Sequence, residues 1–242
     1  MYFERRDSVY WQIRREIMRY PALFGLIFVM FFMVIIEYIV GIYRVAFYLA
    51  FIPYLFLSGF YWTLITHIFL HANFLHFFFN AIALYFVGRY SEQLLGSKLM
   101  LLSFLLSGIV GGLLTLVMAL ILPFVNPFAM HLMDAIFLGA SGAIFGLFAI
   151  LVSDRPNIDI IFFLFLPIIP IILPIRGKGK NILMMLIIFE LIFGLLALPG
   201  DPYGRFGHLG GMLTGVLLYR YYLWKKIYER VYGVEFYSPR GW

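Results

Sequence analysis

The stretch GASGAIFGLFAILVSDRP, which runs from Gly139 to Pro156, decides most about the fold of this chain. It is apolar from Ser141 to the charged pair Asp154-Arg155, which we expect to mark the cytoplasmic surface of a membrane. About 13 residues separate Ser141 from these charges. They make roughly 20 Å of helix, whereas the hydrocarbon core is about 30 Å thick. Ser141 is therefore expected on the order of 10 Å below the outer surface. The non-helical chain that leads to Ser141 must then pack in protein or line water, because irregular backbone is not tolerated in lipid at that depth. We therefore expect Ser141 at the floor of an outward-facing cavity.

The rest of the chain is also strongly apolar. Hydrophobic residues make up 64% of its 242 residues, where average soluble domains are roughly half apolar, so the composition predicts an integral, multi-pass membrane protein. The sequence has no cysteine, which excludes disulfides, thiolate catalysis and cysteine-based metal sites. The formal net charge of +6 does not indicate a nucleic-acid partner, because most basic residues flank apolar runs and thus report membrane topology.

The apolar runs predict an all-α fold, a polytopic bundle of six transmembrane helices. The expected spans are residues 22–40, 68–88, 99–122, 140–153, 181–198 and 207–224. The expected organisation is a cytoplasmic N-terminal segment at 1–21, a membrane domain at 22–224 and a cytoplasmic tail at 225–242. With the N-terminus inside, 16 of the 18 Lys and Arg residues are then cytoplasmic, as the positive-inside rule requires.

A seventh apolar stretch, Ile158 to Ile175, is not expected to span the membrane. If it did, every later segment would change sides and the basic residues would divide nine to nine, against the positive-inside rule. Three prolines, Pro167, Pro170 and Pro174, also interrupt the stretch and would break a regular helix. We therefore predict that residues 156–178 form an extended cytoplasmic connection lying against the membrane.

One serine and one histidine stand out because each lies between glycines inside an apolar run. They are Ser141 and His208. Their flanking glycines are Gly139 and Gly142 for the serine, and Gly207, Gly210 and Gly211 for the histidine. A serine beside a histidine can form a nucleophile with its base. Taken singly, Ser141 also fits a hydroxyl bonded to its own helix turn, and His208 fits a hydrogen-bonded packing residue.

Glycines of the fourth and sixth spans recur at intervals of four residues. They are Gly142 and Gly146 in the fourth span, and Gly207, Gly211 and Gly215 in the sixth. Residues four apart share one face of a helix, and faces of small residues let helix backbones approach closely. The two spans are therefore expected to pack tightly, which would bring Ser141 and His208 within hydrogen-bonding reach.

The second span carries a further polar cluster. His76 and Asn80 are four residues apart and thus share a helix face, where a pair of hydrogen-bond donors suits a developing oxyanion. His67 and His71 are also four apart, and such a pair can bind a metal. This segment offers no obvious third ligand, so neither a metal nor a cofactor is expected.

Together these motifs resemble the rhomboid family of intramembrane serine proteases. The matching pieces are His76-x-x-x-Asn80, Gly139-x-Ser141-Gly142 and Gly207-His208-x-x-Gly211, in the second, fourth and sixth spans and in the family's order. His67 and His71 resemble the family's additional histidines, and Glu92 with Gly96 resembles its cytoplasmic acidic turn. The resemblance covers about residues 22–224.

The resemblance implies a serine endopeptidase that cleaves transmembrane segments of membrane proteins near their extracytoplasmic ends. Ser141 would attack the scissile carbonyl and His208 would take its proton, as a dyad without a third acid. His76, Asn80 and the Ser141 amide would hold the oxyanion, and Phe145 would stack on the base. The partners would be transmembrane substrates and the lipid bilayer, and the location the plasma membrane of a prokaryote with both termini cytoplasmic.

Some alternatives stay open at this point. Glu190, midway along the fifth span, is either a protonated or hydrogen-bonded packing residue, as the cost of burying charge favours, or a third catalytic member. Thr63 follows Trp62 where the family often has an arginine. The rival functions are a non-catalytic binder of client helices, which the intact Ser141 and His208 disfavour, and a histidine-based metal or solute transporter, for which the sequence lacks further ligands.

Overall fold

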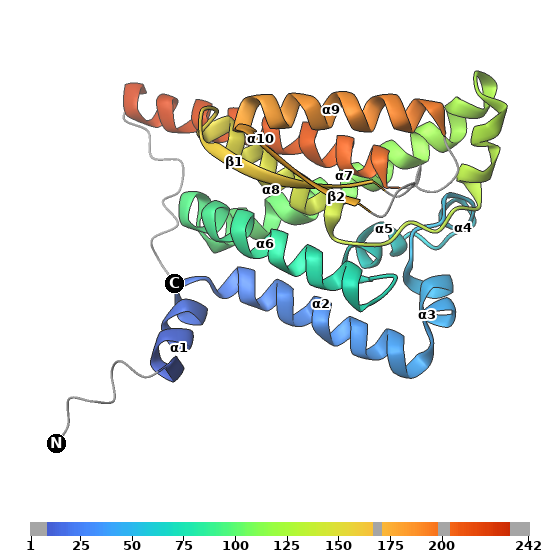
Figure 1. The fold of residues 1–242 in the computed structure, drawn as a ribbon, viewed down its shortest axis with the longest axis horizontal. Coiled ribbons are helices and arrows are strands. Elements are labelled where there is room, and N and C mark those ends of the chain that lie inside the picture. Colours follow the sequence, from blue (N-terminus) through green and yellow to red (C-terminus); the bar gives the residue numbers. More distant parts are fainter. Residues whose placement is uncertain (1–8, 167–170, 198–203, 233–242) are drawn as a thin grey trace.

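The computed structural model describes residues 9–166, 171–197 and 204–232. Its helices are α1 Val9–Arg19, α2 Pro21–Val40, α3 Ile42–Leu49, α4 Pro53–Leu57, α5 Thr63–Thr66, α6 Phe74–Leu95, α7 Ser97–Ile121, α8 Ser141–Asp154, α9 Gly179–Leu196 and α10 Arg205–Tyr232. The 3-10 helices are η1 His67–Phe69, η2 Leu122–Phe124 and η3 Pro127–Met133, and the strands are β1 Asp159–Leu166 and β2 Ile171–Lys178. The protein is thus mostly helical, and α2, α6, α8, α9 and α10 run along its long axis (Figure 1).

Each predicted span overlaps a helix, but not all these helices qualify as spans by themselves. Among the described residues, Pro21–Val40, Ser97–Phe124 and Gly179–Leu196 are long and apolar enough to cross a membrane. A fourth span results if Thr63–Phe69 and Phe74–Leu95, which meet at 90°, are counted as one. The expected short fourth span corresponds to α8, an apolar helix of 14 residues that is too short to qualify as a span by itself. These findings define a helical membrane bundle and leave the number of six spans as a prediction.

The predicted second span is wrong at its outer end. A continuous helix was expected from residue 68, but the chain bends sharply after Phe69 and α6 begins only at Phe74. The side chain of Asn73 accepts a hydrogen bond from the His76 backbone N–H at 2.8 Å, as an N-cap residue does. His67 and His71 therefore precede α6 and do not share a face of it.

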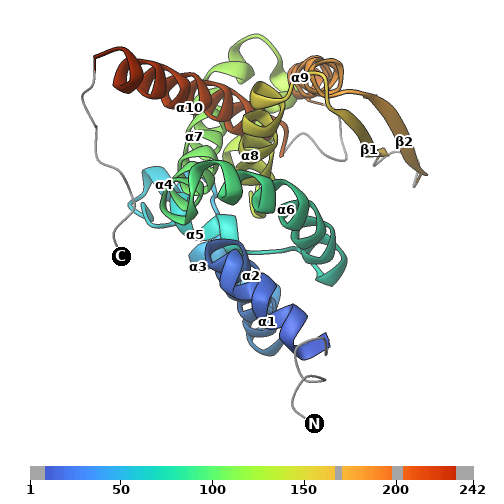
Figure 2. The ribbon, with the colours of Figure 1, turned by 90° about the vertical axis from the view of Figure 1, so that its left-hand side faces the viewer.

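The prediction that residues 156–178 are extended is confirmed for 159–166 and 171–178, but these residues form two strands that the all-α prediction does not include. There β1 and β2 pair as an antiparallel hairpin, in register from Asp159 opposite Lys178 to Leu166 opposite Ile171, and the hairpin lies beside α9 (Figures 1 and 2). The stretch is non-helical, as its prolines indicate, and pairing satisfies backbone groups that an isolated extended segment would leave open. Two of these prolines, Pro167 and Pro170, lie outside the described residues.

Helix α8 lies at the centre of the bundle, in contact with α6, α7, α9 and α10 (Figure 2). Its packing against α10 depends on glycines. A Cβ atom at Gly211 would lie 1.9 Å from the Gly142 carbonyl oxygen, and one at Gly215 would lie 2.0 Å from the Gly146 oxygen. A side chain of any size at these positions would force the helices apart, so the two backbones do approach as closely as the glycine spacing predicts.

Buried polar contacts join the helices near the end where α8 reaches Asp154. The Glu92 carboxylate on α6 accepts hydrogen bonds from the backbone N–H groups of Ala22 and Leu23, at 3.0 and 2.9 Å, and so caps the N-terminus of α2. Asp154 on α8 accepts hydrogen bonds from Tyr90 of α6 and Tyr219 of α10. These carboxylates therefore tie together helices that are distant in sequence.

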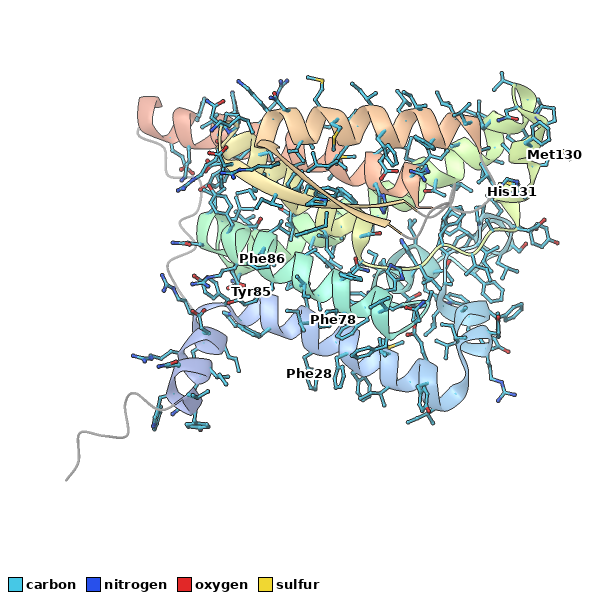
Figure 3. The ribbon with its side chains drawn as sticks, in the orientation of Figure 1. Phe28, Phe78, Tyr85, Phe86, Met130 and His131 are labelled. Atoms are coloured by element: carbon cyan, nitrogen blue, oxygen red, sulfur yellow. The ribbon has the colours of Figure 1, made fainter. Side chains whose placement is uncertain are left out.

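Large apolar side chains also cover the outside of the bundle. Phe28 of α2 is 67% exposed and Met130 of η3 is 68% exposed, and both project away from the ribbon (Figure 3). Apolar surface on this scale indicates contact with an apolar phase, a membrane or a partner, more than with water. Since α2, which carries Phe28, is long and apolar enough to span a bilayer, lipid is the environment that fits this surface.

Candidate active site

The nucleophile candidate lies at the start of α8 and the base candidate lies in the first turn of α10. The Nε2 atom of His208 is 2.8 Å from the Oγ atom of Ser141, a normal distance for a hydrogen bond. The glycine contacts between α8 and α10 make this possible, because Gly142 follows Ser141 directly and its carbonyl oxygen faces Gly211, which lies one turn after His208. The two residues that the sequence singled out are therefore in direct contact.

The imidazole of His208 is held on two further sides. Its Nδ1 atom is 3.0 Å from Oε1 of Glu190 on α9. The ring of Phe145, one turn after Ser141 on α8, lies with its centroid 4.5 Å from that of the imidazole, at an angle of 41°. An ionised carboxylate can only accept a hydrogen bond, so an ionised Glu190 favours the tautomer with the proton on Nδ1, in which the free electron pair of Nε2 faces the Ser141 hydroxyl.

Glu190 also forms a buried ion pair. Its Oε2 atom is 3.2 Å from Nη1 of Arg205, and both side chains are only 7% exposed. The sequence alone assigns Arg205 no role in the site, whereas the structure buries it against α9. One signal was available, since Arg205 precedes His208 by three residues and side chains three apart share a helix face.

His76 and Asn80 of α6 lie beside the chain that leads into Ser141. Gly139 has a φ of +122°, and a Cβ atom there would lie 2.8 Å from Cε1 of His76 and 3.8 Å from Nδ2 of Asn80. Only glycine combines that backbone conformation with so close a contact. The Gly139 N–H donates to the carbonyl oxygen of His67 at 2.9 Å, which fixes this segment to η1.

Hydrogen-bond donors around this segment lack protein partners. The Nδ2 group of Asn80 is buried and makes no hydrogen bond within the described part of the chain. Helix α8 has no side-chain cap at its N-terminus, so its first backbone N–H groups, that of Ser141 included, are free of helical partners. Unpaired donors beside a serine hydroxyl are what an anionic intermediate needs.

The histidines before α6 have separate contacts. The Nδ1 atom of His67 is 2.8 Å from the carbonyl oxygen of Thr63. His71 is buried and its ring meets that of His76 edge to face, with centroids 5.2 Å apart. Its backbone N–H donates to Glu37 of α2 at 2.8 Å. Within residues 9–166, 171–197 and 204–232, no three His, Cys, Asp or Glu side chains are grouped so as to hold a metal ion.

The fold and the site together define a polytopic helical membrane protein in which a serine hydroxyl is hydrogen-bonded to a histidine inside the bundle. The model of the Rhomboid domain matches residues 58–225, and the chain belongs to the rhomboid family. It is similar to RHOMBOID-like protein 7 of Arabidopsis thaliana, with 30% identity over 161 residues. That match covers 65% of this chain and 41% of the relative, so the chain spans about two fifths of the length of the curated relative it matches.

Proposed function

We propose that this protein is an intramembrane serine endopeptidase that cleaves transmembrane segments of other membrane proteins near their extracytoplasmic ends. The observation that carries the proposal is the 2.8 Å contact between His208 Nε2 and Ser141 Oγ. Family membership supports it, because the pair lies within the matched residues 58–225. The plant relative gives no support to a prokaryotic plasma membrane, so the proposed location is an integral membrane protein with both termini cytoplasmic.

The reaction begins with attack of Ser141 Oγ on the scissile carbonyl carbon while His208 Nε2 takes the hydroxyl proton. The carbonyl oxygen becomes an oxyanion, which the Ser141 backbone N–H at the start of α8 and the side chains of His76 and Asn80 stabilise. His208 then gives its proton to the leaving amine. Water enters, loses a proton to His208 and releases the acyl group from Ser141.

The substrate segment must unwind before it is cut. Carbonyl groups of an intact helix already accept backbone hydrogen bonds and are shielded by side chains. Substrates with small residues and helix breakers near the cut site are therefore favoured. The bundle itself supplies the protein surroundings in which an unwound segment is tolerated within a membrane.

The test uses the purified full chain in detergent, with a fluorophosphonate probe and a model transmembrane substrate. The wild type should be labelled and should cleave, while Ser141→Ala and His208→Ala should do neither and yet remain folded. Undiminished cleavage by Ser141→Ala would overturn the proposal. A wild type that is neither labelled nor active, yet retains the substrate on co-purification, would instead identify a non-catalytic binder of client helices.

A further inference from the structure

A buried charged cluster on α9 and α10 adjoins the Ser141–His208 pair. Glu190 uses both carboxylate oxygens, Oε1 toward His208 Nδ1 at 3.0 Å and Oε2 toward Arg205 Nη1 at 3.2 Å. The Arg205 guanidinium also lies 5.1 Å from the ring centroids of both Phe189 and Phe193. The Glu190 carboxylate therefore lies between the Arg205 guanidinium and the His208 imidazole and contacts both.

Stability alone does not explain this cluster. Ionisable residues inside a membrane are costly, and a buried ion pair is often no more stabilising than apolar residues of similar volume. The Arg205 guanidinium, held over two aromatic rings, stabilises the negative charge of Glu190. A carboxylate kept ionised in this way can accept a hydrogen bond from Nδ1–H of the imidazole through its other oxygen.

We propose that Glu190 is a positioning residue for the base, held in place by Arg205, an inference that rests on the proposed function. The carboxylate fixes the His208 tautomer with Nδ1 protonated, so that the electron pair of Nε2 points at the Ser141 hydroxyl. When the Ser141 proton moves to Nε2, Glu190 stabilises the imidazolium that results and stays ionised itself, the role that the acid has in soluble serine protease triads.

The arrangement makes catalysis depend on the position of α9. The nucleophile lies on α8, the base on α10 and the carboxylate on α9, and α9 meets α10 closely at Gly194, where a Cβ atom would lie 3.0 Å from Cζ of Phe206. If α9 moved away from α10, Glu190 would leave His208. The base is then aligned only while α9 packs as it does here.

The competing explanation is that Glu190 and Arg205 only fasten α9 to α10, with His208 as an incidental neighbour. The double variant Glu190→Leu/Arg205→Leu separates the two explanations, because it removes the charges together and leaves no unpaired ion in the bundle. If Glu190 positions the base, kcat of the double variant for a model transmembrane substrate should fall by about 100-fold or more. Loss of the acid in serine protease triads lowers kcat by up to roughly 10⁴-fold. KM and the melting temperature should stay close to wild type. A folded double variant with kcat within threefold of wild type would overturn the proposal.

Two more variants keep the test decisive. Glu190→Gln/Arg205→Leu retains an oxygen that accepts the Nδ1–H hydrogen bond, and it should recover about 10-fold of the lost kcat, a recovery that a purely structural role does not produce. If the double leucine variant fails to fold, the nearly isosteric Glu190→Gln replaces it. Its kcat should then fall at least about 10-fold at unchanged KM, and a loss below twofold would overturn the proposal.

The matched control is Glu92→Gln. Glu92 is likewise a buried carboxylate that accepts hydrogen bonds from protein, from the Ala22 and Leu23 backbone N–H groups and the Ser97 hydroxyl, but it caps α2 from α6, away from the site. This change should lower the melting temperature and leave kcat of the folded protein unchanged. Cleavage that persists in Ser141→Ala would overturn the proposed function itself. If Ser141→Ala is inactive while the Glu190 variants are fully active, only the positioning role of Glu190 is overturned.

Discussion

Replacing Gly211 by alanine should reduce catalysis by separating two helices. A Cβ atom at Gly211 would lie 1.9 Å from the Gly142 carbonyl oxygen, and real Cβ atoms essentially never come within 3.0 Å of a neighbour. Because the obstacle is backbone, α10 must move from α8 by at least about 1.1 Å. His208 lies one turn before Gly211 and Ser141 lies directly before Gly142, so the same shift acts on the Nε2–Oγ contact.

The expected loss of kcat follows from the change in the Nε2–Oγ distance. A shift of that size along the line between the two atoms would lengthen the Nε2–Oγ distance from 2.8 Å to about 3.9 Å, beyond a hydrogen bond. Misplacement of reacting groups by about 1 Å can cost on the order of 10²-fold in rate. Gly211→Ala should therefore lower kcat by about 10- to 100-fold and also lower the melting temperature.

The assay is cleavage of a model transmembrane substrate by purified protein, with thermal unfolding measured in the same detergent. The control is Gly25→Ala in α2, where a Cβ atom has no neighbour within 4 Å and alanine favours the helix. That variant should match the wild type or exceed it in stability. Wild-type kcat in Gly211→Ala would refute the reasoning, because it would mean that the helices can separate without disturbing the pair.

Two further predictions concern the oxyanion and the topology. Asn80→Ala should lower kcat by about 10²–10³-fold with little change in KM, the pattern of a contact made in the transition state. Its stability should stay near wild type, because Nδ2 has no partner in the described protein. An unfolded variant whose surviving fraction keeps full kcat would show a structural role instead. A reporter fused after Trp242 should read as cytoplasmic, from the 16 of 18 basic residues that six spans place inside, and an extracytoplasmic signal would contradict the six-span topology.

Much of the site could be predicted because its residues are unusual where they stand. Ser141 and His208 are polar residues between glycines in apolar runs, and the cost of such groups in a membrane makes them visible without any structure. The glycine spacing likewise indicates a close helix contact, since it depends on a local periodicity. Composition alone was enough to predict an integral membrane protein.

Other features depend on contacts between segments far apart in the sequence, or on segments whose local sequence does not specify one structure. The bend between Phe69 and Phe74 contains His71 and Asn73, but polar residues alone do not show a bend, and the Asn73 cap is seen only in the structure. The hairpin of β1 and β2 follows from pairing between strands, whereas prolines indicate only that no helix forms. Hydropathy measures how apolar a segment is and says nothing about such pairing.

The sequence by itself determined the membrane class, the short helix that begins at Ser141 and the candidate pair of Ser141 and His208, because each is a property of local composition and periodicity. Only the tertiary structure decided that Glu190 and Arg205 meet His208. Hydropathy does not give the rotation of α9 about its axis, which the packing of whole helices sets, and that rotation directs Glu190 toward the imidazole at 3.0 Å.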